Sequence, residues 1–341
     1  MRLRIGVALV VSLVLLAASC QGIYAQMAAS KATQAFLGIE SYRAVTRETG
    51  ILPGNEELVK DVVYQKPWKL AATVTKPEAW KGSRFAYDGV TVSMWWPSEL
   101  FGIRILGAAP PGLDQVEQVM EEDALWAAKR YAFAYDGWQA VAGRSCDVWS
   151  GVPREKEPFV YPYTACMDRA SLMPLSLTLF CEPKKPCYSF SFESITLGAP
   201  VPEDAFTIHY PKNAVVFEWD LGDPGEPVES LRAEMNFPVL LPRDLPSGLK
   251  VQKAVRGRSC IPMLLLDMRS GARFVTLTEM RSLGSAPMSE AGIPVKIGSA
   301  DGRLTFMGVF GVIAWVKGRT ALTLVGNLPA GALVTIASSV K

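Results

Sequence analysis

Short runs in which apolar and polar residues alternate recur along most of the chain, and a period of two predicts strands. In the run from residue 68 to 75, Trp68, Leu70 and Val74 fall on one face. Residues 84–96 hold Asp88-Gly89 between two such runs, which is a strong hairpin signal. The second run of this hairpin puts these apolar side chains on one side: Val90, Val92, Met94 and Trp96. The pattern predicts an antiparallel sheet with an unusually apolar face.

One segment has the period of a helix instead. It follows the break at Pro110-Pro-Gly112, with Asp114 as the expected N-cap and Glu117 placed to complete a capping box. Apolar residues then recur at helical spacing: Val116, Met120, Ala124 and Ala127. We expect this helix to cover one face of the sheet.

Residues 131–195 read as consecutive hairpins. Asp136-Gly137 is expected to turn the first strand back on itself, and two hairpins follow, 144–168 and 175–192. Each of these two carries a matched pair of cysteines, Cys146 with Cys166 and Cys181 with Cys187.

The cysteine pairs fit disulfides. A turn centred on residue 156 places Cys146 directly opposite Cys166, and Cys181 and Cys187 flank the loop 182–186, whose two prolines are not expected to extend the strands. Opposed strand residues come close enough for an S–S bond. The alternative is that some of these cysteines are small buried apolar residues.

The C-terminal third has a different texture. A stretch rich in proline, glycine and acidic residues predicts a linker over 219–230, and 231–341 reads as short strands ended by a helix over 329–337, a compact α+β module. The larger first domain is expected over 27–218.

The N-terminus predicts export. Arg2 and Arg4 precede an apolar stretch and the small-residue site Ala17-Ala-Ser-Cys20, which is typical of a lipoprotein signal over 1–20 with Cys20 acylated. Ordinary cleavage after Ala25 is the alternative. In either case the mature chain is expected outside the cytoplasm, where disulfides persist. With Cys20 acylated, it is expected to be anchored to a membrane of the cell envelope, on the periplasmic side.

Composition narrows the function. The 35 basic and 33 acidic residues are spread without long runs, which argues against nucleic acid as a partner. We find no catalytic motif, and the single histidine, His209, gives poor support for a metal site. Asp168 and Glu193 are expected to be solvated. We therefore expect no enzyme, no cofactor and no metal.

Aromatic and methionine side chains instead suggest a binding surface. Bulky apolar residues on both faces of the strands indicate an apolar cavity that can accept acyl chains. The expected lipid-binding residues are Trp68, Leu70, Val74, Met94, Trp96, Phe101, Met120 and Phe190. The alternative is that the aromatics fill the core beneath the helix.

Residues 41–210 resemble the LolA-like superfamily, and more nearly the RseB/MucB-type sigma-E regulators. The resemblance is carried by these motifs: Val141-Ala-Gly-Arg144, Pro153-Arg154, Met167-Asp-Arg169, Met173-Pro-Leu175 and Pro202-Glu-Asp-Ala-Phe206. It implies an α+β fold in which a curved antiparallel half-barrel wraps around helices and is followed by a smaller α+β domain. The hairpin cysteines depart from the family pattern.

The resemblance also implies a function: an exported, lipid-anchored envelope protein that binds acyl chains or lipoprotein signals. Its C-terminal domain would regulate an anti-sigma factor or another membrane protein. The alternatives are an anchored structural or adaptor lipoprotein without a ligand, and a lipoprotein-sorting carrier.

Overall fold

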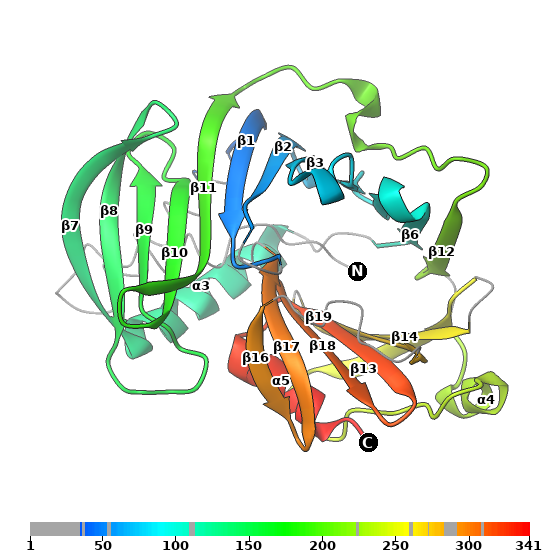
Figure 1. Cartoon of the computed structure of the whole chain (residues 1–341). Helices are drawn as coiled ribbons and strands as arrows, with labels where there is room; N and C mark the ends of the chain where they lie inside the picture. Colours follow the sequence, from blue (N-terminus) through cyan, green and yellow to red (C-terminus); the bar gives the residue numbers. More distant parts are fainter. Residues whose placement is uncertain are drawn as a thin grey trace.

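The computed structural model describes two antiparallel-dominated sheets, of 12 and 7 strands, with few helices (Figure 1). The described residues are 35, 38–52, 56–108, 113–222, 225–258, 262–271, 273–282, 292–307 and 310–341. The predicted signal with Cys20 lies outside these ranges, as does Cys260.

The first sheet is curved and does not close on itself (Figure 1). Its strands are β1 (Ser41–Thr49), β2 (Leu58–Gln65), β3 (Lys69–Lys76), β4 (Arg84–Tyr87), β5 (Val92–Trp96), β6 (Phe101–Leu106), β7 (Tyr131–Val141), β8 (Arg144–Pro153), β9 (Tyr163–Asp168), β10 (Pro174–Glu182), β11 (Lys185–Leu197) and β12 (Val215–Asp220). Their spatial order is β12-β6-β5-β4-β3-β2-β1-β11-β10-β9-β8-β7, and only β12 and β6 pair in parallel. The predicted α+β half-barrel is confirmed.

A helix and a long connection cover the two faces of this sheet. Helix α3 (Leu113–Arg130) leads from β6 to β7, and its Ala124 and Ala127 are buried against the inner face. On the outer face, the segment 198–214 crosses from β11 to the far edge at β12 (Figure 1). Phe206 and Ile208 of this segment pack on Trp95 and its neighbours. The sheet is therefore covered on both sides around β3, β4 and β5, which explains why apolar residues occur on both faces there.

The first predicted hairpin of the 131–195 block is wrong in its position. Tyr131–Val141 is one strand, in which Asp136-Gly137 forms an irregularity of register and Gly137 has φ +108°. The chain turns instead at Ala142-Gly143, both with positive φ (52° and 73°), so that Val141 pairs with Arg144. A two-residue turn of this kind matches the strand twist, even though alanine rarely adopts that conformation.

Both predicted cysteine pairs are bonded, with Cα–Cα distances of 5.4 Å for Cys146–Cys166 and 5.6 Å for Cys181–Cys187. The predicted registers are wrong. Cys166 lies opposite Val148, so the first disulfide joins diagonal neighbours. In the second hairpin the pairing reaches Glu182 and Lys185, and Pro186 lies inside β11 where a loop was expected.

The second sheet consists of β13 (Lys250–Arg256), β14 (Met263–Ser270), β15 (Arg273–Arg281), β16 (Ile293–Ile297), β17 (Ala300–Met307), β18 (Phe310–Lys317) and β19 (Thr320–Gly326), in the order β13-β14-β15-β19-β18-β17-β16. Two helices flank it, α4 (Val228–Glu234) and α5 (Ala330–Ser339). One face packs on α5, where Leu333 and Ile336 meet Leu277 and Leu324. The predicted C-terminal helix is confirmed, whereas β13, β16 and α4 were missed.

The other face of the second sheet packs against the first. Val255, Met263, Leu265 and Phe274 belong to the same buried cluster as Trp219 of β12. This sharing means that the smaller sheet covers part of the concave side of the larger one.

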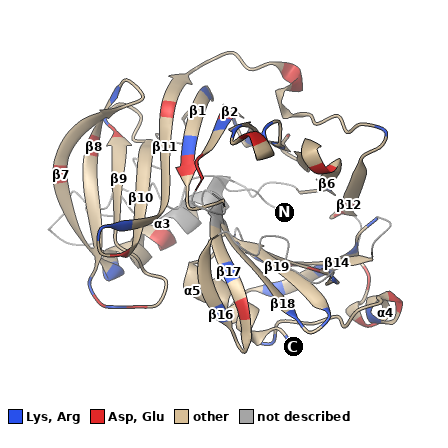
Figure 2. Cartoon of the chain, in the orientation of Figure 1, with Lys and Arg blue, Asp and Glu red and all other residues tan. Residues whose placement is uncertain are grey.

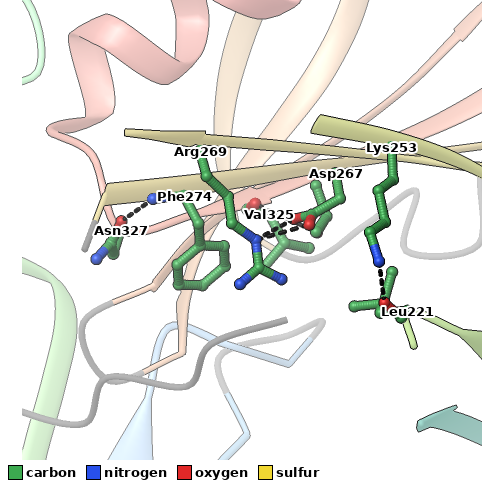
Figure 3. Close-up of polar contacts among 8 residues, drawn as sticks. Leu221, Lys253, Asp267, Arg269, Phe274, Val325 and Asn327 are labelled. Atoms are coloured by element: carbon green, nitrogen blue, oxygen red, sulfur yellow. Dashed lines mark hydrogen bonds and ion pairs between the residues drawn. The ribbon is translucent and has the colours of Figure 1, made fainter. Parts of the chain in front are cut away.

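Polar contacts connect the second sheet to the first sheet and to α3 as well. Lys253 Nζ donates to the Leu221 carbonyl at 2.6 Å (Figure 3). The Arg273 guanidinium pairs with Asp123 of α3. The Arg258 amide donates to the Glu218 carbonyl at 2.7 Å. Strand β12 ends at Asp220 and α4 begins at Val228, and the predicted domain boundaries stay predictions.

Candidate functional site: the inner face of the first sheet

Strand register assembles one apolar face across the first sheet. Tyr42 lies opposite Tyr64, Tyr64 opposite Leu70, and Leu70 opposite Tyr87. The row continues through Val92 and Ile105 to Trp219. Because side chains of directly paired residues lie on the same face, these registers define the inner face. Its further apolar members include Ala44, Val62, Ala72, Phe85, Ile103 and Phe217.

Most predicted lipid-binding residues lie on this face. The registers that define it also place six of them there: Leu70, Val74, Met94, Trp96, Phe101 and Phe190. Trp68 is buried at the start of β3, with 5% of its surface exposed. Met120 lies in α3, and its side chain is outside the described part of the structure. Their role in lipid binding stays a prediction.

Aromatic rings line the two ends of the face. Phe101 stacks on Trp96 at a centroid distance of 5.4 Å and meets Phe217 edge-on at 4.9 Å. At the other end Phe190 and Phe192 are in T-shaped contact at 5.1 Å. Rings in such contacts present rigid apolar walls.

A polar group interrupts the apolar surface between these ends. Thr46 and Glu48 of β1 and Lys60 of β2 share the inner face, since Thr46 is paired with Lys60 and Glu48 with Leu58. Lys60 Nζ forms an ion pair with Glu48 Oε1. Sequence reasoning missed this group, although Thr46 and Glu48 continue the alternation that begins at Tyr42 and Ala44.

The motif residues Arg144 and Asp168 have a structural role. Arg144 donates to Asp168 through Nε at 3.0 Å and Nη2 at 2.8 Å, and the Ser171 amide and hydroxyl complete the set at 2.7 and 2.6 Å. Burial opposes ionisation, but these donors outweigh it and lower the pKa of Asp168. The expectation of a solvated Asp168 is therefore wrong, and Glu193 pairs with Arg47 at 2.6 Å.

Two cavities lie along the seam between the sheets. One of about 610 Å³ is bounded by Pro158 and Phe159 of the β8–β9 connection and by Val334 and Ser338 of α5. A smaller one of about 290 Å³ lies beside the Cys181–Cys187 disulfide.

The chemistry available in the described ranges is limited. No group of three or more His, Cys, Asp or Glu residues there could hold a metal ion, and His209 is exposed on the crossing segment. No described helix has both the length and the apolar character needed to span a membrane. Charged residues of both signs are scattered over both sheets in Figure 2.

The comparisons with known proteins bear on this region. Residues 108–210, from the end of β6 through α3 and the disulfide hairpins to the crossing segment, match the family described as the MucB/RseB N-terminal domain. This region is a MucB/RseB-like domain. Comparison with curated protein sequences gives no match.

Solved structures of MucB/RseB and LolA-like proteins are similar over most of their lengths. The Pseudomonas aeruginosa MucA/MucB complex is 16% identical, with 92% of this chain and 96% of that chain covered and a TM-score of 0.44. MucB alone is 15% identical, with 91% and 95% covered and a TM-score of 0.47. The Mycobacterium tuberculosis lipoprotein LppX is 14% identical, with 53% and 99% covered and a TM-score of 0.35.

Proposed function

We propose that this MucB/RseB-like protein is exported, is anchored through an acylated Cys20, and binds acyl chains on the inner face of its first sheet. The observation that carries the proposal is the continuity of the apolar row from Leu197 through Tyr42 to Trp219, on a face that many partly buried side chains line. Each methylene of an acyl chain buried there contributes about 0.8 kcal/mol.

The second half of the proposal is regulatory. The MucB/RseB match supports a partner of the anti-sigma type for this chain, as the resemblance of its motifs implies. The 610 Å³ cavity beside α5 offers a surface for such a partner, since α5 presents Val334, Thr335 and Ser338 there. Binding of a ligand to the inner face would then be transmitted to the partner through the second sheet, which packs on that face.

A second candidate function has an observation in its favour. Met263, Leu265 and Phe274 of the second sheet already pack against the apolar cluster of the first. A face filled in this way suits an anchored adaptor that holds no ligand. A lipoprotein-sorting carrier would use the same face without the regulatory partner.

Filling the face tests the binding proposal. Ala72 lies on the inner face between Val62 and Phe85, whereas Ala140 is exposed on the edge strand β7. We expect Ala72→Phe to weaken displacement of a fluorescent fatty acid about tenfold, because the added ring occupies acyl-chain space. Ala140→Phe is the matched control and leaves displacement unchanged.

Native mass spectrometry of the mature protein gives an independent reading. Co-purified lipid on the wild type, reduced in Ala72→Phe, supports the binder. A clean apo mass together with no fatty-acid displacement favours the adaptor and overturns the proposal.

A further inference from the structure

Burying the polar group on the inner face costs free energy of folding. Glu48 and Lys60 have only 6% and 20% of their side-chain surface exposed, and Thr46 has 3% of its residue surface exposed. Taking two charges out of water costs several kcal/mol per ion before their attraction offsets it, and apolar residues of similar size often do as well. Packing alone therefore does not account for this pair.

The neighbours of the group are apolar. Directly opposite Thr46 and Glu48 on β11 are Phe192 and Phe190, and beyond Lys60 on β3 is Val74. Leu58 lies opposite Glu48. The negative charge of Glu48 adds to burial in raising the pKa of Tyr188, which places that ring beside the group.

Hydrogen-bonding capacity remains unused here. Among the described residues, Thr46 Oγ1 has no hydrogen-bond partner although it is buried. Buried hydroxyls are nearly always bonded, so one without a partner on a candidate binding face points to a ligand. The Glu48 carboxylate can accept further hydrogen bonds and the Lys60 ammonium can donate them.

We propose that Thr46, Glu48 and Lys60 recognise a neutral amide that links an acyl chain to its head group. This inference rests on the proposed acyl-chain binding. The amide carbonyl accepts from the Thr46 hydroxyl or the Lys60 ammonium, and the amide N–H donates to Glu48. Both partners of the ion pair stay in place.

Charge neutrality distinguishes an amide from other head groups. A carboxylate drawn to Lys60 competes with Glu48 and leaves a charge without its partner in apolar surroundings, which is strongly unfavourable. An ester supplies the carbonyl but no N–H. The site is therefore selective for amides over both esters and free acids.

The test compares three probes of one chain length on the mature protein, N-methyldodecanamide, methyl dodecanoate and dodecanoate, each displacing a fluorescent fatty acid. We expect the amide to bind about tenfold more tightly than the ester, the effect of about 1.4 kcal/mol from one added hydrogen bond. Thr46→Val keeps the side-chain shape and removes the hydroxyl. We expect it to weaken the amide and the ester alike, severalfold, because both offer a carbonyl to this hydroxyl.

A matched control is available on the same sheet. Thr73 of β3 lies opposite Asp61 and Arg84, on the outer face, so Thr73→Val removes a hydroxyl away from the site and should leave the binding of both probes unchanged. Thermal melts of both variants establish that they fold.

The outcomes separate this inference from the proposed function. Equal binding of amide and ester, or unchanged amide binding in Thr46→Val, overturns the amide site and leaves acyl-chain binding standing. Binding of none of the three probes overturns the proposed function and this inference with it.

Discussion

Two buried carboxyl groups, one in each sheet, are held in opposite states. Asp168 of β9 has 2% of its surface exposed and accepts hydrogen bonds from Arg144 and Ser171, which lower its pKa. Glu279 of β15 is fully buried and accepts one backbone hydrogen bond, from Leu240 at 2.9 Å, while its Oε1 has no partner among the described residues.

The donors around each group explain the difference. Burial raises the pKa of Glu279 to about 8, and the Leu240 amide and the more distant Arg232 oppose it only in part. At Asp168 the same penalty is outweighed by four donor contacts. Burial alone therefore does not decide whether a carboxyl is charged.

The strongest test of this comparison is Asp168→Ala. Removing the carboxylate leaves the partly buried Arg144 without its partner, so we expect a loss of about 3 kcal/mol in the free energy of unfolding at pH 7, measured by urea denaturation. Asp301→Ala is the control, because the Lys296–Asp301 pair is exposed and surface ion pairs contribute little to stability. Equal losses in the two variants would show that Asp168 is no more important than a surface charge.

A smaller effect is expected from Glu279. A carboxyl whose pKa is raised on folding stabilises the protein fully below its unfolded pKa, near 4, and this contribution is lost as pH rises through about 8. Stability of the wild type should therefore fall by about 2 kcal/mol between pH 5 and 6.5 relative to Glu279→Gln, which cannot ionise. Parallel pH profiles of the two proteins would contradict the assignment of a neutral Glu279.

The smallest expected effect belongs to Ser171→Ala. The variant removes the hydroxyl donor but keeps the amide donor, so we expect a loss of about 1 kcal/mol. Because the pKa of Asp168 is lowered on folding, its contribution is present above about pH 4 and is lost as pH falls through the folded pKa. The Ser171→Ala deficit should accordingly shrink in denaturation at pH 2 to 3, and a constant deficit would argue against a bond to the charged carboxylate.

Sequence alternation predicted much of the first sheet, because successive side chains of a strand point to opposite faces, and the resemblance to LolA-like proteins predicted the fold class. The period of the side chains gave wrong predictions where backbone geometry or strand register decides the structure. Asp136-Gly137 has the composition of a turn but occupies a bulge, and the register of Cys166 depends on that of the whole β8–β9 pair. Lys250–Arg256 is mostly polar, as suits an edge strand, so its apolar signal is weak.

The candidate site was only half visible in the sequence. Apolar residues such as Met94 and Trp96 could be assigned to one face from their spacing, whereas the Glu48–Lys60 pair required the register between β1 and β2. Arg144 and Asp168 are 24 positions apart, and only the path of the chain through the hairpins brings them together.

Phe274 and Met263 of the second sheet belong to the buried cluster of the first sheet, so they compete with any ligand for the same space. A ligand that binds to the concave face at their position would have to displace part of the second sheet. The measured affinity of the ligand would then be its intrinsic affinity multiplied by the fraction of molecules in which the second sheet has moved aside. A partner that holds the second sheet away from the first would raise the affinity for the ligand by the inverse of that fraction. By linkage, the ligand would raise the affinity for that partner by the same factor.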